Sequence, residues 1–353
     1  MKIPESYFCK KEKDSLQCMV CPHGCILKEG QRGRCFVRMM QEGQMVLDTY
    51  GRCSGLSIDP IEKKPLYHFL PGSRTLSFGT AGCNLTCRFC QNWGLSRSKS
   101  MDRMMVSAMP EAIAAAALRE GCRSVAYTYN DPVIFLEYAM DTAKACREVG
   151  LLSVAVTAGY IHGKAREDFF SHMDAANVDL KAFSDSFYRK YCGASLGPVL
   201  ETLCYIRQET SLWLELTTLL IPGYNDSDKD LDAMVDWILE HLGPDVPLHF
   251  TAFHPDHEFL HVKRTPAAIL LRARKRAMDR GLFHVMTGNI PEEEGSSTFC
   301  HHCGELLIAR RGYHITQRRL SEKGLCPLCC TACAGVFDGG LKACCQNSES
   351  SKW

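Results

Sequence analysis

The sequence predicts an α/β protein built on a partial (β/α) barrel of six to seven units, with small Cys-rich N- and C-terminal modules. Three observations predict this class. The chain has 353 residues, 46% of them hydrophobic, which is enough for a full core and one or two small appendages. Residues 74–289 alternate short β-branched runs with amphipathic stretches. Most of the 21 cysteines cluster near the two ends or just after the first of these runs.

The barrel units follow from the alternation of strand and helix signals. Pro110 opens a helical stretch that Gly121 closes, and residues 226–228 precede another with apolar residues at helical spacing. The basic stretch 265–281 has the apolar spacing of an ordinary outer helix. Right-handed crossovers curl six or seven such units into an open barrel, with the chemistry at the carboxyl ends of the strands. The expected strands cover residues 74–80, 124–129, 152–157, 177–183, 213–221, 247–253 and 283–289.

Cysteine distribution divides the chain. We expect a Cys-rich N-terminal metal-binding module over residues 1–70 and the barrel over 71–292. A zinc-ribbon-like module is expected over 293–345, followed by a disordered tail over 346–353.

Charge and hydropathy restrict location and partners. The formal net charge of +1 gives no field that would draw the whole molecule onto nucleic acid or an anionic membrane. The first 15 residues carry charges where a signal peptide needs an apolar stretch, and no run approaches 18 apolar residues. We therefore expect a cytoplasmic protein without membrane association, in which so many reduced cysteines point to metal.

One loop carries three closely spaced cysteines. Cys83, Cys87 and Cys90 follow the first expected strand with the spacing C-x3-C-x2-C. Most electron-transfer [4Fe-4S] clusters have four cysteine ligands, so three thiolates leave one iron open to an exogenous ligand. If the amino and carboxylate groups of S-adenosylmethionine (SAM) bind that iron, one electron can cleave the S–C5′ bond to a 5′-deoxyadenosyl radical. A partial zinc site and coincidence are the alternatives.

This loop resembles the motif of the radical SAM superfamily, C-x3-C-x-Φ-C, in which the aromatic residue lies near the adenine; here that residue is Phe89. From Cys18 to about Phe337 the chain resembles radical SAM enzymes of the AmmeMemoRadiSam system, within the group related to pyruvate formate-lyase activating enzymes. The resemblance implies a radical SAM core, a [4Fe-4S] cluster and SAM. It assigns no catalytic residue.

The resemblance also implies SAM contacts at two strand ends. Residues 127–132 stand where many relatives carry a Gly-Gly-Glu-Pro type motif that receives the SAM amino group, so Asn130 or Asp131 is expected to accept it. An Asn-Asp-Pro turn that only caps a helix is the alternative. Asp179-Leu180-Lys181 matches a motif whose lysine reaches the SAM carboxylate or ribose, although Asp179 and Lys181 share a strand face and could simply pair.

Three further segments resemble parts of the activating enzymes. Residues 157–160 match a Thr-Asn-Gly-aromatic stretch, but Ala158 replaces the amide and puts a polar contact there in doubt. Residues 219–226 resemble a segment that borders SAM. His254 matches a histidine that contacts SAM hydroxyls, whereas a lone histidine is more often structural.

The C-terminal cysteines have the spacing C-x2-C-x22-C-x2-C. Four thiolates close a tetrahedron around zinc without an open position, so the site would be structural. The basic residues between the two cysteine pairs are expected to form a solvated surface of the ribbon, and binding of an anionic partner or RNA is the alternative. The expected ligands are Cys300, Cys303, Cys326 and Cys329, with Cys330, Cys333, His301 and His302 as substitutes, and the basic residues are Arg310, Arg311, Arg318, Arg319 and Lys323.

A second metal site is expected near the N-terminus. Cys18, Cys21, Cys25 and Cys35 have the spacing C-x2-C-x3-C-x9-C on a short, turn-rich segment. The spacing differs from that of bacterial ferredoxins, so zinc and an auxiliary iron–sulfur cluster both remain candidates.

These observations favour an enzyme that starts a radical reaction on another molecule in the manner of an activase. The candidate substrates are a partner polypeptide, a nucleic acid, a peptide and a small metabolite. It would need an electron donor such as flavodoxin or ferredoxin, and the family name suggests AMMECR1-like and Memo-like partner proteins. A non-catalytic metal-cluster or RNA-binding module is the main alternative, and a zinc hydrolase is a third.

Overall fold

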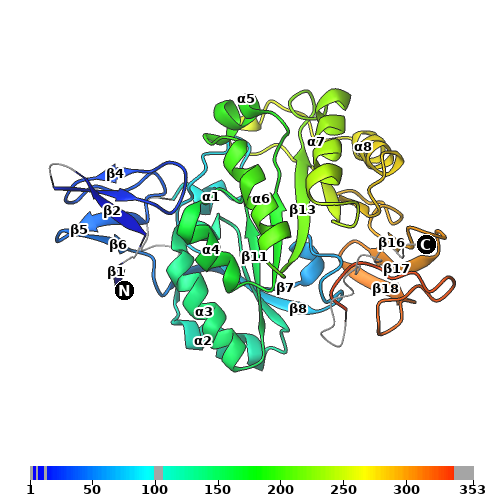
Figure 1. Ribbon diagram of the computed structural model, residues 1–353, viewed down its shortest axis with the longest axis horizontal. Helices are drawn as coiled ribbons and strands as arrows, with labels where there is room; N and C mark the ends of the chain where they lie inside the picture. Colours follow the sequence, from blue (N-terminus) through cyan, green and yellow to red (C-terminus); the bar gives the residue numbers. More distant parts are fainter. Residues whose placement is uncertain (1–2, 5–6, 12–13, 99–105, 338–353) are drawn as a thin grey trace, which may run out of the picture.

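The computed structural model describes residues 3–4, 7–11, 14–98 and 106–337. Its centre is a nine-stranded sheet in the order β15-β14-β13-β12-β11-β10-β8-β7-β9. Each crossover between its parallel strands places helical segments on the outside of the sheet (Figure 1). The parallel strands are β8 (Arg74–Gly79), β10 (Ser124–Tyr127), β11 (Leu152–Thr157), β12 (Ala175–Asp179), β13 (Trp213–Leu220), β14 (Leu248–Ala252) and β15 (Val285–Gly288).

The seven expected strands all form, and their order along the chain is also their order across the sheet. This confirms the predicted α/β class with a partial barrel, because the linear order leaves the sheet open at two edges. Two strands were not expected. β7 (Arg52–Pro60) pairs antiparallel with β8, and β9 (Val106–Ser107) pairs antiparallel with β7. The domain division stays a prediction, and part of its first segment extends the large sheet.

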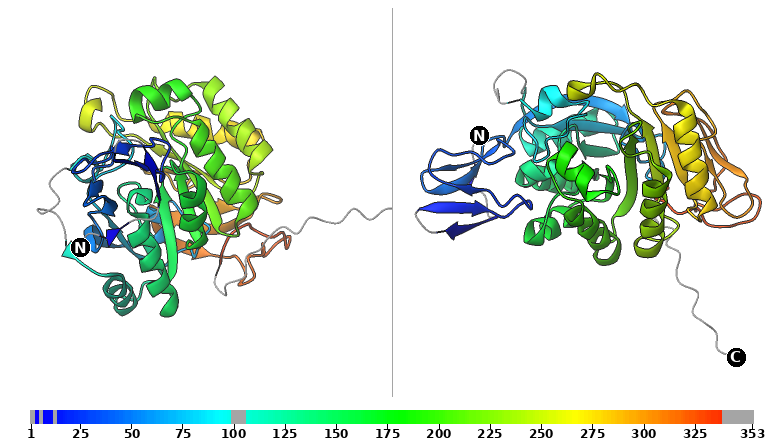
Figure 2. Two further views of the ribbon diagram at one scale, coloured as in Figure 1. Left: turned by 60° about the vertical axis from the view of Figure 1, so that its left-hand side comes forward. Right: turned by 90° about the horizontal axis from the view of Figure 1, so that it is seen from above.

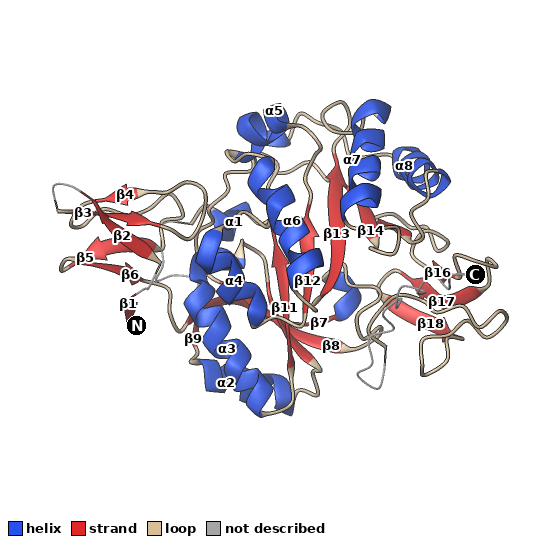
Figure 3. Cartoon of the chain, viewed as in Figure 1, coloured by secondary structure: helices blue, strands red, loops and turns tan. Residues whose placement is uncertain are grey.

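The helices pack on the outer face of the sheet (Figure 3). α2 begins at Pro110 as predicted and buries Ile113, Ala114 and Ala117. α7 begins after Ser227, whose hydroxyl oxygen accepts a hydrogen bond from the Asp230 amide. The helices are α1 (Trp93–Ser96), α2 (Pro110–Arg119), α3 (Leu136–Glu148), α4 (Gly163–Ser171), α5 (Asp185–Phe187), α6 (Gly197–Glu209), α7 (Asp228–His241) and α8 (Ala267–Asp279), with short helical turns at Ile61–Lys63, Pro132–Phe135, Tyr188–Cys192 and His257–Phe259.

Helix α8 is the outer helix that its apolar spacing predicted. It buries Leu270, Ala273 and Ala277. Its basic face pairs with acidic residues of α7, where Arg276 contacts Asp232 at 2.6 Å. The basic charge of this stretch is therefore used within the fold.

Two small antiparallel sheets precede the barrel and lie beyond one end of it (Figures 1 and 2). A third small sheet lies at the opposite end. The first has the order β1-β6-β5, from β1 (Ile3–Pro4), β5 (Arg38–Gln41) and β6 (Gln44–Leu47); the second has β2 (Phe8–Lys11), β3 (Ser15–Cys18) and β4 (Ile26–Leu27); the third has β16 (Thr298–Phe299), β17 (Leu306–Arg311) and β18 (His314–Arg318).

The C-terminal segment attaches to the barrel through backbone hydrogen bonds. Leu70 N donates to Val336 O, and Val336 N donates to His68 O, both at 2.7 Å. At the outer edge of β15, the Thr287 amide donates to Gly295 O at 2.8 Å. The tail expected over 346–353 lies outside the described residues.

Candidate active site

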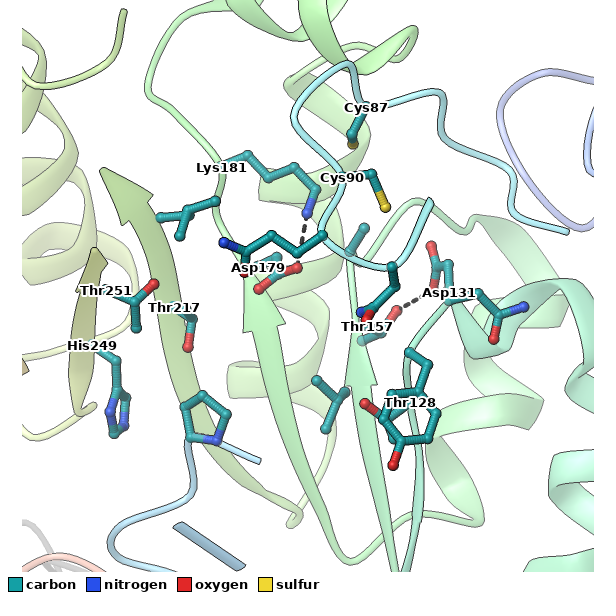
Figure 4. A pocket seen from close by; sticks show the side chains of 18 of the residues that line it. Cys87, Cys90, Thr128, Asp131, Thr157, Asp179, Lys181, Thr217, His249 and Thr251 are labelled. Atoms are coloured by element: carbon teal, nitrogen blue, oxygen red, sulfur yellow. Dashed lines mark hydrogen bonds and ion pairs between the residues drawn. The ribbon is translucent and has the colours of Figure 1, made fainter. Parts of the chain in front are cut away.

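A cavity of about 330 Å³ opens at the carboxyl ends of the parallel strands. The loop after β8 closes one side, and residues on or just after β10 to β15 line much of the rest (Figure 4). Residues of the segment 62–67, between β7 and β8, and Tyr313 complete the lining. This is the position at which parallel α/β folds place their ligands, because several loops converge there.

The three cysteines of the predicted cluster motif all line this cavity. Burial raises the pKa of Cys83 and of Cys90, and a hydrogen bond with Cys192 together with burial raises that of Cys87. The structure therefore brings Cys83, Cys87 and Cys90 together on one wall, as the sequence predicted.

The Asn130 side chain fixes the cluster loop through hydrogen bonds to its backbone. Its Oδ1 accepts from the Thr80 amide at 3.2 Å, and its Nδ2 donates to Gly82 O at 2.7 Å. Close packing demands glycine at position 79, since a Cβ there would lie 2.4 Å from Thr128 O. The Asn130 side chain lines the cavity, but its amide is occupied in fixing the loop.

Asp131 presents a buried carboxylate to the same cavity. Its Oδ1 accepts from Thr157 Oγ1 at 2.6 Å, and its Oδ2 has no hydrogen-bond partner among the described residues. Burial raises its pKa to about 6. A buried acceptor without a partner costs free energy unless a ligand supplies a donor, so Asp131 is suited to a cationic or hydrogen-bonding ligand. The preceding Tyr129 has a φ of 71°, an unusual backbone conformation of the kind found at functional sites.

Lys181 and Phe89 also line the cavity. Lys181 Nζ lies 2.8 Å from Asp179 Oδ2, so the pair that the sequence left as an alternative is present, and both side chains face the cavity (Figure 4). Phe89 is buried against Phe187 and Phe259, with ring centroids 5.7 and 5.8 Å away. It forms an apolar wall beside Cys87 and Cys90.

Some of the other predicted site residues line the cavity and one does not. Ala158 and Leu219 line the cavity, and Gly159 has a φ of 66°. His254, by contrast, is exposed and is not one of the cavity-lining residues. The structure therefore does not bring His254 together with the other predicted SAM-binding residues.

Sequence reasoning missed the polar end of the cavity. His249, Thr217 and Thr251 lie there (Figure 4). His249 Nε2 is 2.6 Å from Oε2 of Glu215, a fully buried carboxylate that also accepts from the amides of Tyr67 and His68 and from Trp213 Nε1. The signal was available, because Glu215 and Thr217 stand two residues apart on one mostly apolar strand, as do His249 and Thr251 on the next.

The four C-terminal cysteines that were predicted as ligands gather at one point. The sulfurs of Cys300, Cys303, Cys326 and Cys329 all lie within 4.8 Å of one another. Cys300 and Cys329 are 3.6 Å apart, as are Cys303 and Cys326. Hydrogen bonding to Thr331 lowers the pKa of Cys329 to about 5, which favours the thiolate that a metal ion needs.

The basic surface expected between these cysteines is smaller than predicted. Arg310 is fully buried, with its guanidinium 2.6 Å from Tyr67 O and 3.4 Å from Glu62 Oε1. Arg319 forms an ion pair with Glu305. The expectation that Arg310 lies on a basic surface, solvated or anion-binding, is therefore wrong, because this side chain joins the C-terminal sheet to the barrel.

The four N-terminal cysteines lie around a second, smaller cavity of about 20 Å³. Asn84, the residue after Cys83, forms part of its wall. The two sets of cysteines thus lie on either side of one short segment of the cluster loop.

Comparison with known proteins agrees with this geometry. A family model described as the Radical SAM superfamily matches residues 78–238. An uncharacterized protein of Methanocaldococcus jannaschii is 39% identical over 324 residues, which are 92% of this chain and 96% of the relative. The pyruvate formate-lyase-activating enzyme of Clostridium pasteurianum is 28% identical over 172 residues, 48% of this chain and 70% of the relative.

A solved structure supports the fold. The crystal structure of a radical SAM methyltransferase from Sphaerobacter thermophilus aligns with a TM-score of 0.50 and 14% identity, over 86% of this chain and 81% of that chain. Within the part of the chain that the structure describes, no helix has the length and apolar character needed to cross a membrane.

Proposed function

This chain belongs to the radical SAM superfamily, and from that premise we propose that it binds a [4Fe-4S] cluster through Cys83, Cys87 and Cys90 and cleaves SAM reductively. It is a radical SAM enzyme. The observation that carries the proposal is the shared wall: three cysteines from one loop line the same cavity as a buried carboxylate oxygen without a partner. Three thiolates leave one iron of a cubane open, and the carboxylate suits a cationic group beside it.

The chain's own residues fit SAM in three places. Asp131 Oδ2 would accept from the amino group of the methionine part, while Thr157 fixes the other oxygen. Lys181 Nζ, oriented by Asp179, would pair with the SAM carboxylate or ribose. Phe89 would lie against the adenine, as the superfamily motif implies. Asn130 acts on the cluster loop, since its amide is already bonded to Thr80 and Gly82.

When bound and reduced, the cluster supplies the electron that divides SAM into methionine and a 5′-deoxyadenosyl radical, which abstracts a hydrogen atom from substrate. The protein orients SAM and excludes water from the reacting carbon. Buried apolar side chains such as Leu85 and Phe89 on the cavity wall serve the second purpose.

We propose an activase-like reaction on a partner polypeptide. Support comes from the similarity to an enzyme named as a pyruvate formate-lyase-activating enzyme. The reaction needs a low-potential reductant such as flavodoxin or ferredoxin, and AMMECR1-like and Memo-like proteins are the partners to test first. Reduced thiols are required throughout, so the proposed location is the cytoplasm.

We further propose that Cys300, Cys303, Cys326 and Cys329 bind zinc as a structural ribbon. Around one zinc ion, sulfurs about 2.3 Å from the metal lie about 3.8 Å apart. The observed distances of 3.6 Å within two pairs suit such an ion. A purely RNA-binding module is not favoured, because Arg310 is buried and Arg319 is paired.

The test is anaerobic turnover. Protein reconstituted with iron and sulfide is reduced with dithionite and incubated with SAM, and 5′-deoxyadenosine is quantified beside a Cys83→Ala/Cys87→Ala/Cys90→Ala variant. Release by the wild type alone supports the proposal. A fully loaded wild-type protein that releases none, even with the candidate partners, would refute SAM cleavage.

A further inference from the structure

The four cysteines around the smaller cavity face space that the protein leaves unfilled. Cys18, Cys21, Cys25 and Cys35 line it together with apolar side chains that include Val133 and Ile134. Its volume of about 20 Å³ is close to the minimum for one water molecule. Ordinary buried cysteines fill such space by packing, whereas here four thiols surround it.

One of these four sulfurs accepts a hydrogen bond from a backbone amide. The Arg34 amide donates to Cys25 Sγ at 3.5 Å. Such a donor stabilises the negative charge of a thiolate, which is the form that binds a metal.

The spacing of the sulfurs separates this set from the zinc-ribbon set. Among the described residues, two groups of three or more possible ligand atoms lie within 4.8 Å of one another. One is the ribbon set and the other is His68, His284 and Cys333, so neither includes an N-terminal cysteine or a cysteine of the cluster loop. Ligands of a single zinc ion must approach one another within about 3.8 Å. In an iron–sulfur cluster the ligands are divided among two or four irons, so no three of them gather around one metal atom.

We propose that Cys18, Cys21, Cys25 and Cys35 bind an iron–sulfur cluster. No three of these four sulfurs lie within 4.8 Å of one another, nor do those of Cys83, Cys87 and Cys90, whereas the four ribbon sulfurs do. Four thiolates occupy four ligand positions, so this cluster has no iron open for SAM. The assignment of an iron–sulfur cluster here is argued from the N-terminal cysteines themselves. Only the statement that it is the second cluster of the protein rests on the proposed function.

The N-terminal set is packed directly against the cluster loop. A Cβ built on Gly82 would lie 2.2 Å from Cys35 O, so only glycine permits this approach. On the other side of Cys83, His23 Nε2 lies 2.8 Å from Asn84 O. The two proposed clusters would therefore share the wall formed by residues 82–84.

The experiment measures metal in full-length protein reconstituted anaerobically with iron and sulfide. The decisive variant is Cys83→Ala/Cys87→Ala/Cys90→Ala, which leaves the N-terminal set intact. We expect this variant to retain roughly two to four iron atoms and as many sulfides per chain, with the visible absorption of an iron–sulfur cluster. Adding Cys18→Ala and Cys21→Ala should remove both, whereas adding Cys9→Ala and Cys122→Ala, two cysteines outside the cavity, should not.

Two results would overturn the proposal. Either the triple variant contains no iron and two zinc ions, or it contains only the zinc of the ribbon. If the variant that combines all five substitutions, with Cys18→Ala and Cys21→Ala added to the triple variant, fails to fold, the iron and sulfide content of the triple variant still tests the proposal. Failure of SAM cleavage is a separate outcome: a wild type that makes no 5′-deoxyadenosine, beside a triple variant that keeps its iron, would refute the proposed function and leave this site standing.

Discussion

Thr157 holds one oxygen of Asp131 at 2.6 Å and leaves the other without a partner among the described residues. Thr157 is the last residue of β11, and Asp131 lies between the end of the neighbouring strand β10 and the helical turn Pro132–Phe135. The bond to Thr157 therefore fixes the orientation of the carboxylate. Such a carboxylate is positioned before its ligand arrives. This reduces the ordering that binding would otherwise require.

The first prediction concerns this carboxylate. Asp131→Asn should raise the dissociation constant for SAM by roughly 10- to 100-fold, since hydrogen bonds to charged groups contribute about 1.5–3 kcal/mol. Equilibrium dialysis on reconstituted protein of matched iron content measures it. Thr157→Val leaves the charge of Asp131 in place and should weaken SAM binding less than Asp131→Asn does. An unchanged constant in Asp131→Asn would remove Asp131 from the SAM site.

The second prediction distinguishes SAM recognition by Lys181 from a simple ion pair. Lys181→Met should weaken SAM binding about tenfold, because it removes the cation nearest the proposed carboxylate position. Lys190→Met, at an exposed lysine in the same segment, is the matched control. If Lys181→Met lowers the melting temperature and leaves SAM affinity unchanged, the residue only pairs with Asp179.

The third prediction concerns the zinc ribbon. Cys326→Ser should lose about one zinc ion per chain and lower the melting temperature, since a structural metal contributes folding free energy. Elemental analysis and a thermal scan measure both. Cys330→Ser changes an exposed cysteine beside the ribbon and should keep the zinc. Equal zinc contents in the two variants would contradict the ligand assignment.

The fourth prediction tests the buried arginine between the C-terminal sheet and the barrel. Arg310→Met leaves Glu62 buried without its ion pair and should destabilise the fold by about 3–5 kcal/mol. Arg311→Met, at the exposed neighbour, should stay within about 0.5 kcal/mol of wild type. Urea midpoints give the comparison, and similar midpoints for the two variants would show that Arg310 carries no such role.

The fifth prediction concerns acid stability. Burial and the neighbouring His301 lower the pKa of His284 to about 3, and its ring also faces His68 and Cys333. The unfolded chain binds a proton below about pH 6.5, while folded His284 stays neutral, so stability should fall as the pH drops from 6.5 towards 3. Its share is at most about 1.4 kcal/mol per pH unit.

His284→Gln should therefore flatten the pH dependence of the urea midpoint between pH 6.5 and 4, whatever it does to stability at pH 7. His172→Gln, at a half-buried histidine on the barrel surface, serves as the comparison. Parallel curves for wild type and His284→Gln would show that folding does not lower the pKa of His284.

Much of the barrel could be predicted because buried parallel strands are continuous apolar runs. Ser124–Tyr127 and Leu152–Thr157 are of this kind. β7 could not be recognised, since RCSGLSIDP lacks clear alternation and contains a glycine; it forms a strand because the edge of β8 is available to pair with it. Local sequence carries no information about such an edge.

The site was predictable where a motif fixed it and less so elsewhere. The cysteine positions follow from spacing on one loop, but the burial of Arg310 depends on Glu62, 248 residues away in the chain. The alternation of side chains along a strand would have identified His249 as a candidate site residue. His249 lies within β14 and faces the same side as cavity-lining Thr251, whereas His254 lies two residues beyond the end of that strand.

The hydrogen bond from Thr287 to Gly295 bears on how this open barrel avoids self-association. An uncovered strand at a sheet edge offers unpaired amides and carbonyls to any passing strand, and fibrous aggregates grow from such edges. At β15 the Thr287 amide is bonded to Gly295, and the Val285 carbonyl accepts from Arg274 Nε at 3.0 Å. The segment after β15 thus occupies backbone groups at the open edge of the sheet and protects the enzyme against aggregation. This role does not depend on any metal that the C-terminal segment carries.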